Sequence, residues 1–182
     1  AGKPLAALQG MDRDARVIYA GTFSKVMYPG VRLGYLVVPE DLVGAFNTGL
    51  YDLYRPGQLI LQAALTDFIN EGHMAALIRR LRVTYKARRD LLARLLRQAL
   101  GERATITGSD AGLHLCLRFS DTAIDDSEVA ERLAAGRFQV RPLSAYHAGP
   151  SCYPGLVIGY AYIPEDRVEA SSERLATAIT AA

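Results

Sequence analysis

One long stretch of helical periodicity in the middle of the chain limits most strongly what this sequence can fold into. Between residues 74 and 100, apolar side chains recur at three- and four-residue spacing, which predicts one amphipathic helix. Gly101 supplies a stop signal at its C-terminal end. The repeating apolar positions are Met74, Leu77, Ile78, Leu81, Tyr85, Leu92, Leu95, Leu96 and Ala99. We expect this helix to connect two parts of the chain that have different patterns.

The part before the long helix combines short strands with further helices. Strands are predicted at Val17–Ala20, where we expect a short buried strand, and at Leu33–Val38, because both runs are rich in β-branched and aromatic residues. Helical patterning covers Leu42–Tyr54 and Gln58–Asn70. Pro29 and Gly30 rule out a regular element between the two strands.

The last 80 residues alternate between strand and helix signals. Leu113–Phe119 is apolar at alternate positions, which predicts a half-buried strand, and a helix follows at Asp125–Ala135. Short strands are expected at Phe138–Val140 and Leu156–Ala161, and a final helix at Glu165–Ile179. This order predicts an α+β lobe.

Composition excludes several classes of protein. Half of the 182 residues are apolar and 22% are charged, which excludes intrinsic disorder, and no apolar run is long enough to span a bilayer. The net charge of +2 provides no argument for nucleic-acid binding. The two cysteines and three histidines lack metal-ligand spacing, so we expect no metal site. Sparse cysteine fits a cytoplasmic protein, and a chain that begins with Ala1 instead of Met suggests a fragment.

The long helix carries many cationic side chains on the face opposite its apolar positions. They are Arg79, Arg80, Arg82, Lys86, Arg88, Arg89, Arg94 and Arg97. We interpret them as a solvated helix face, with direct contact to DNA as the alternative.

The segment that follows the first strand holds the residues with the clearest chemistry. Thr22, Ser24 and Lys25 lie at a strand end, and Arg32 lies seven residues after the lysine. A lysine amine can form a Schiff base with an aldehyde, hydroxyls can bind phosphate oxygens, and a guanidinium can bind a phosphate dianion through two hydrogen bonds. The set therefore suits a phosphorylated aldehyde. A surface lysine in a Ser/Thr-rich loop is an equally good interpretation of the residues alone.

This segment resembles the lysine region of fold-type-I, pyridoxal-phosphate-dependent aminotransferases. More specifically, Arg16–Lys25 and Arg32–Pro39 are similar to the aminotransferase-like domain of MocR-type regulators, which belong to the GntR superfamily of transcription factors. Similarity continues through four later blocks at residues 78–90, 111–115, 140–144 and 155–161.

The resemblance implies an α/β fold and assigns roles to the residues. Residues 1–72 would be the C-terminal portion of the large cofactor-binding domain, and residues 73–182 would comprise the linking helix and the small C-terminal domain. Lys25 would be the Schiff-base lysine of pyridoxal 5′-phosphate, and Thr22, Ser24 and Arg32 would hold the cofactor phosphate.

Two departures from the family pattern bear on function. The aspartate that pairs with the pyridine nitrogen would lie upstream of Ala1, so this chain should bind the cofactor weakly or not at all. Val157 stands where many aminotransferases have an arginine for the substrate carboxylate, which argues against ordinary amino-acid transamination. Arg141 and Tyr146 are candidates to replace that arginine, although a purely structural role in their loop is an alternative.

Two functions are therefore open. The first is the effector-sensing part of a MocR-type regulator, which would be a cytoplasmic homodimer that binds a small amino compound and contacts DNA only through an N-terminal winged-helix domain outside this chain. The second is a fragment of a free-standing class I/II aminotransferase that acts on an amino acid. Whether the parent is an enzyme is left open by the sequence.

Overall fold

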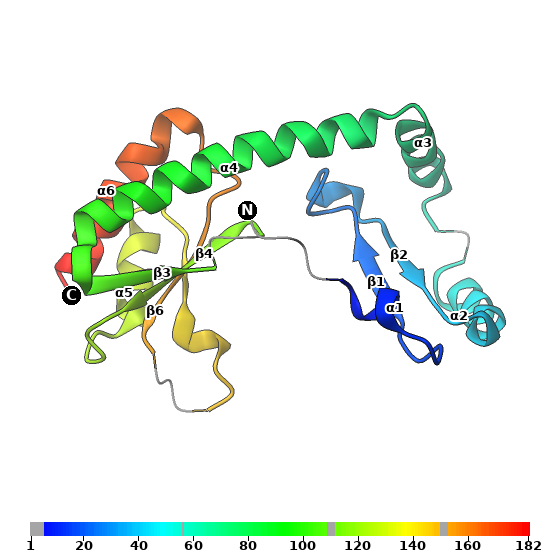
Figure 1. Ribbon diagram of the computed structural model, residues 1–182, viewed down its shortest axis with the longest axis horizontal. Helices are drawn as coiled ribbons and strands as arrows, with labels where there is room; N and C mark the ends of the chain where they lie inside the picture. Colours follow the sequence, from blue (N-terminus) through cyan, green and yellow to red (C-terminus); the bar gives the residue numbers. More distant parts are fainter. Residues whose placement is uncertain (1–5, 56, 109–111, 150–152) are drawn as a thin grey trace. The chain divides into compact units, whose positions relative to one another are not determined.

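The computed structural model describes residues 6–55, 57–108, 112–149 and 153–182. The chain divides into two compact units, one that extends to Leu81 and one that comprises Arg82–Ala182. The division falls inside the longest helix, α4 (His73–Leu100), which contributes residues to both units (Figure 1). This helix confirms the central prediction from the sequence. Within the described residues, no helix combines the length and the apolar character needed to cross a lipid bilayer.

The N-terminal unit contains a β-hairpin followed by helices. Strands β1 and β2 pair in antiparallel fashion, with Tyr19 opposite Val37 and Thr22 opposite Gly34. Its elements are α1 (Leu8–Met11), β1 (Tyr19–Thr22), the short 3-10 helix η1 (Pro29–Val31), β2 (Gly34–Val37), the 3-10 helix η2 (Glu40–Leu42), α2 (Val43–Tyr54) and α3 (Leu59–Asn70). Helix α2 ends at Arg55, and Gly72, at a φ of 81°, separates α3 from α4. These helices agree with the sequence patterns.

Almost nothing in the N-terminal unit is buried. Among the described residues up to Leu81, Met74 alone has a buried side chain. The expectation of a buried strand at Val17–Ala20 is therefore wrong, since β1 lies two residues later and its residues are exposed or half-buried. Large apolar side chains remain open to solvent here, among them Leu53 at 87% and Ile60 at 86% exposure. Exposure on this scale means that the unit does not supply its own core, and that further polypeptide must cover it in a stable protein.

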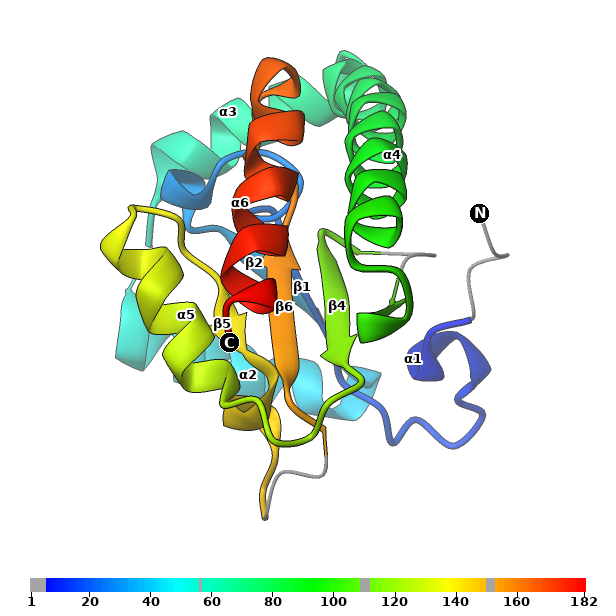
Figure 2. The same ribbon diagram turned by 90° about the vertical axis from the view of Figure 1, so that its left-hand side faces the viewer.

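The C-terminal unit has a four-stranded antiparallel sheet in the order β3-β4-β6-β5. Its strands are β3 (Ala104–Thr107), β4 (His114–Phe119), β5 (Arg141–Pro142) and β6 (Gly155–Gly159). Its helices, besides the second part of α4, are α5 (Asp126–Ala135) and α6 (Val168–Thr180), and 3-10 turns lie at Gly101–Arg103, Leu143–Tyr146 and Glu165–Arg167. Figure 2 shows α6 and α5 running past the strands of this sheet.

The core of the C-terminal unit lies between one face of this sheet and the three helices. Strand β4 shows the alternation that the sequence predicted, because Leu115, Leu117 and Phe119 are each 1% exposed while His114 and Arg118 are exposed. The fully buried side chains that meet them are Leu92 and Leu96 of α4, Val129 of α5, Leu156 and Ile158 of β6, and Val168 and Leu175 of α6. Each such side chain contributes about 1.5–3 kcal/mol when removed from water.

Two strands of this sheet differ from the sequence prediction. Strand β3 was not expected, and the strand expected at Phe138–Val140 is wrong, because pairing begins only at Arg141. Arg137 has a positive φ of 62°, so the backbone is still turning where a strand was expected. Pro142 has no N–H to donate, which confines β5 to two residues at the edge of the sheet.

A buried carboxylate connects three segments of the C-terminal unit. Asp126, at the start of α5, is 3% exposed. Its carboxylate accepts hydrogen bonds from the Ser144 N–H at 3.0 Å, the Ser144 hydroxyl at 2.6 Å and the Gly155 N–H at 2.9 Å. These bonds join the helix to the turn that follows β5 and to the first residue of β6, so Asp126 holds the edge strand β5 in its register.

Asp126→Asn should therefore destabilise the protein by about 1–3 kcal/mol, because the amide group can accept through only one atom and brings two protons to a cluster of donors. Chemical denaturation followed by circular dichroism measures the change. Glu131→Gln, on the same helix at an exposed position, is the matched control and should have little effect. Equal stabilities of the two variants would contradict the role given to Asp126.

Candidate functional site

The four residues singled out from the sequence lie in one hairpin. Thr22 ends β1, Ser24 and Lys25 lie in the turn that follows it, and Arg32 lies two residues before β2. The Phe23 N–H donates to the Leu33 carbonyl at 3.1 Å, which extends the strand pairing one step beyond the sheet. The two ends of the connecting loop are therefore held side by side, and the loop carries both Lys25 and Arg32.

The turn that presents Lys25 is built from local hydrogen bonds. The N–H groups of Val26 and Met27 both donate to the Phe23 carbonyl, at 3.1 and 2.9 Å. The Thr22 hydroxyl accepts from the Ser24 N–H at 3.2 Å and donates to the Leu33 carbonyl at 3.4 Å. Thr22 thus fixes the shape of the turn, and the Lys25 side chain is left exposed at its tip.

Arg32 reaches the site from a constrained backbone position. The short 3-10 helix η1 precedes it, and Arg32 ends that helix in the left-handed region with a φ of 47°. A non-glycine residue with positive φ is uncommon and costs conformational energy. Its side chain lines a hollow of about 570 Å³ within the N-terminal unit, together with Phe23 of the loop and residues of α2 and α3.

Three polar residues of this hollow were not identified from the sequence. Gln58, Gln62 and Thr66 face the same hollow as Arg32. Their spacing of four residues places them on one face of α3, and this periodicity in an otherwise apolar helix is the signal that could have found them. Gln62 and Thr66 are also connected directly, because the Thr66 hydroxyl donates to the Gln62 carbonyl at 2.8 Å.

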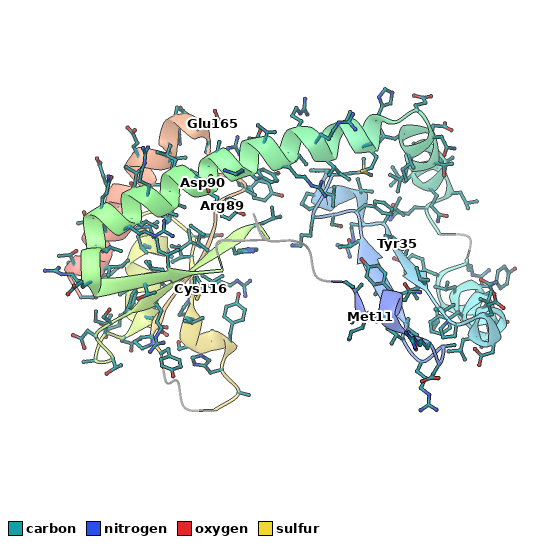
Figure 3. All side chains as sticks on the ribbon, in the orientation of Figure 1. Met11, Tyr35, Arg89, Asp90, Cys116 and Glu165 are labelled. Carbon is teal, nitrogen blue, oxygen red and sulfur yellow. The ribbon has the colours of Figure 1, made fainter. Side chains whose placement is uncertain are left out.

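Two glycines and an aromatic cluster shape the hairpin beneath the loop. Gly21 lies opposite Tyr35, and any side chain at Gly21 would overlap the Tyr35 ring. A Cβ at Gly34 would lie 2.9 Å from the Gly21 carbonyl oxygen. The Tyr35 ring, labelled in Figure 3, lies 6.0 Å from the Tyr19 ring and 5.4 Å from the Phe23 ring. A hydrogen bond with the Tyr19 phenol raises the pKa of Tyr35 above its ordinary value.

The charges of the loop suit an anionic ligand. Loop residues 23–33 include Lys25 and Arg32 but no acidic residue. Neither cation is assigned an ion pair or hydrogen bond within the described ranges, and the same holds for the Ser24 hydroxyl. A primary amine, a hydroxyl and a guanidinium on one short loop are the donor set that a phosphorylated aldehyde requires. The residues present therefore fit pyridoxal 5′-phosphate.

The remaining sequence candidates lie in the other unit. Arg141 belongs to β5 and is exposed, directly opposite Val157 of β6. Tyr146 ends the 3-10 turn after β5 and is 58% exposed. The structure thus brings Thr22, Ser24, Lys25 and Arg32 together on one hairpin and places Arg141 and Tyr146 in a separate sheet region.

Comparisons with known proteins agree with this donor set. The family described as "Aminotransferase class I and II" matches residues 1–175. The chain is 42% identical over 170 residues to the "Probable rhizopine catabolism regulatory protein MocR" of Rhizobium meliloti, covering 89% of this chain and 33% of that protein. It is 31% identical over 177 residues to the "Uncharacterized HTH-type transcriptional regulator YhdI" of Bacillus subtilis, covering 97% of this chain and 38% of that protein.

A solved structure shows the same fold. The kynurenine aminotransferase of Pyrococcus horikoshii superposes with a TM-score of 0.87 at 25% sequence identity, covering 100% of this chain and 45% of that one. The chain therefore spans between a third and a half of the length of the proteins it matches.

Proposed function

The chain belongs to the aminotransferase class I and II family, and we propose that it is the effector-sensing part of a MocR-type transcriptional regulator. The support is the difference in identity: two HTH-type or regulatory proteins match at 42% and 31%, whereas the aminotransferase of known structure matches at 25%. We propose, as before, a large-domain portion at residues 1–72 and a linking helix with small domain at 73–182. The parent protein would be a cytoplasmic homodimer that contacts DNA through a separate winged-helix domain.

The observation that carries the proposal is the placement of Lys25, Ser24 and Arg32 on one short loop without acidic neighbours in that loop. Pyridoxal 5′-phosphate supplies an aldehyde that reacts with primary amines and an electron-withdrawing ring. In our proposal the Lys25 Nζ binds that aldehyde, while the Ser24 hydroxyl and the Arg32 guanidinium hold the phosphate. Thr22 contributes by fixing the turn through its bonds to Ser24 and Leu33, and its hydroxyl oxygen completes the phosphate site.

Regulation would follow from competition at Lys25. A small amino compound that takes the place of the Lys25 amine frees this side chain from the cofactor and changes the contacts of the loop. A ligand that binds one conformation better than another shifts the balance between them by its differential affinity. We propose that this shift is what the DNA-binding domain of the parent detects.

A free-standing aminotransferase is the second candidate. The family and the TM-score of 0.87 to a kynurenine aminotransferase favour it, because they show the fold of such enzymes. Val157 counts against an amino-acid transaminase, since a valine cannot bind a carboxylate. An HTH segment upstream in the parent gene would support the regulator, and its absence would support the enzyme.

We predict that borohydride reduction of the full-length protein loaded with pyridoxal 5′-phosphate attaches the cofactor to Lys25. Lys25→Ala should abolish the attachment and leave the circular dichroism spectrum unchanged, because the side chain is exposed at a turn. Lys86→Ala is the matched control, since Lys86 is an exposed lysine engaged with Asp90 at 2.7 Å. Peptide mass spectrometry locates the adduct. An adduct of equal yield on another lysine in the Lys25→Ala protein would disprove the assignment.

We also predict that the isolated 182 residues bind the cofactor weakly or not at all. The phosphate donors lie at exposed positions, where a charge pair contributes about 0–1 kcal/mol. Micromolar affinity requires about 8 kcal/mol. A spectrophotometric titration of the 182-residue chain measures the affinity, and tight binding that Lys25→Ala abolishes would show that the described residues suffice by themselves.

A further inference from the structure

The sheet of the C-terminal unit has a second face, which does not contribute to the core. Side chains directly opposite each other on antiparallel strands point to the same side. One such row crosses all four strands, because Thr107 pairs with Cys116, Cys116 with Val157, and Val157 with Arg141. Its members are exposed or half-buried, in contrast to the buried rows on the other side.

The neighbouring rows give this face a positive charge. Arg118 pairs with Thr105 on one side and Gly155 on the other, and His114 pairs with Gly159. The face therefore carries Arg118, Arg141 and His114, while the strands β3, β4, β5 and β6 contain no aspartate or glutamate. Gly155 and Gly159 contribute no side chain, so the sheet backbone itself is open between the two arginines.

The two arginines differ in what holds them. The Arg118 guanidinium lies 3.5 Å from the centre of the Tyr153 ring, a stacking contact that orients its planar group. Arg141 is exposed, and across the described ranges no hydrogen bond, ion pair or ring contact is assigned to its side chain. A free guanidinium beside an oriented one provides the donors that a planar anion needs.

The backbone beneath Arg141 is fixed. The Asp126 carboxylate binds Ser144, two residues after β5, and Gly155, at the start of β6. This bridge holds the edge strand in place although β5 is only two residues long. Arg141 is thus a mobile cationic side chain on a rigid base, which is suited to binding.

We propose that this face of the C-terminal sheet binds a small organic carboxylate, and that Arg141 is the residue that binds its two oxygens. The half-buried side chains of Cys116 and Val157 lie between the cations and provide an apolar surface for the carbon skeleton of the ligand. A free phosphate has no apolar part for this surface, and therefore a carboxylate is the better match. The proposal concerns the C-terminal unit alone and does not depend on cofactor binding at Lys25.

Saturation-transfer NMR on the full-length protein without added cofactor tests the proposal, with propionate, propylammonium and inorganic phosphate as probes. Propionate should bind, and Arg141→Gln should weaken its binding about tenfold or more, the loss typical of a charge-assisted bidentate contact. Arg141→Lys should weaken it by a smaller factor, because an ammonium group keeps the charge and lacks the planar pair of donors. Arg97→Gln, at an exposed site of α4 in the same unit, is the control and should leave it unchanged.

The experiment has outcomes that overturn the proposal. Propionate that does not bind, or that binds the Arg141→Gln protein as well as the parent, removes Arg141 from the role. Phosphate that binds as tightly as propionate and responds equally to Arg141→Gln overturns the carboxylate assignment. Because Arg141 is exposed, an unchanged thermal midpoint in Arg141→Gln should accompany the loss of binding, and a lowered midpoint would indicate a structural role instead.

Discussion

Burial of apolar side chains between one face of a four-stranded sheet and three helices is the interaction on which the described structure depends. That core lies in the C-terminal unit, where Leu92, Leu117 and Leu175 are at most 1% exposed. The N-terminal unit has no equivalent, since Met74 is the one buried side chain among its described residues. Folding requires apolar burial to offset the loss of chain entropy, and exposed groups such as Ile60 do not provide it.

The candidate site belongs to the unit that lacks a core, and this has consequences for function. Its geometry comes from backbone pairing, from the Thr22 hydroxyl and from two glycines that allow the strands and the Tyr35 ring to approach closely. These interactions shape the loop that carries Lys25 and Arg32, but they do not surround a ligand. The same division explains why the chain can retain the reactive lysine of its family and still hold the cofactor weakly.

Sequence patterns predicted the elements whose signals are local. The long helix and the helices before it follow from apolar periodicity, and β4 follows from strict alternation. Strand β3 was missed because Ala104–Thr107 is only four residues long and is defined by its pairing with β4, which is a tertiary contact. The strand at Phe138–Val140 was wrong because alternating apolar residues there continue a turn at Arg137. Burial of β1 was wrong because composition predicts a preference for burial and cannot say what covers the strand. For the site, the residue types came from the sequence, whereas the Thr22 bond to Leu33 and the polar face of α3 required the fold.

Hydrogen exchange tests the central claim, that the N-terminal unit depends on further polypeptide whereas the C-terminal unit has its own core. Amide exchange would be followed by mass spectrometry in the 182-residue chain and in the full-length protein. The account predicts that amides of β4, β6 and α6 are protected in both, and that amides of β1, β2 and α2 exchange rapidly in the 182-residue chain but are protected in the full-length protein. Equal protection of β1, β2 and α2 in the two proteins would contradict it.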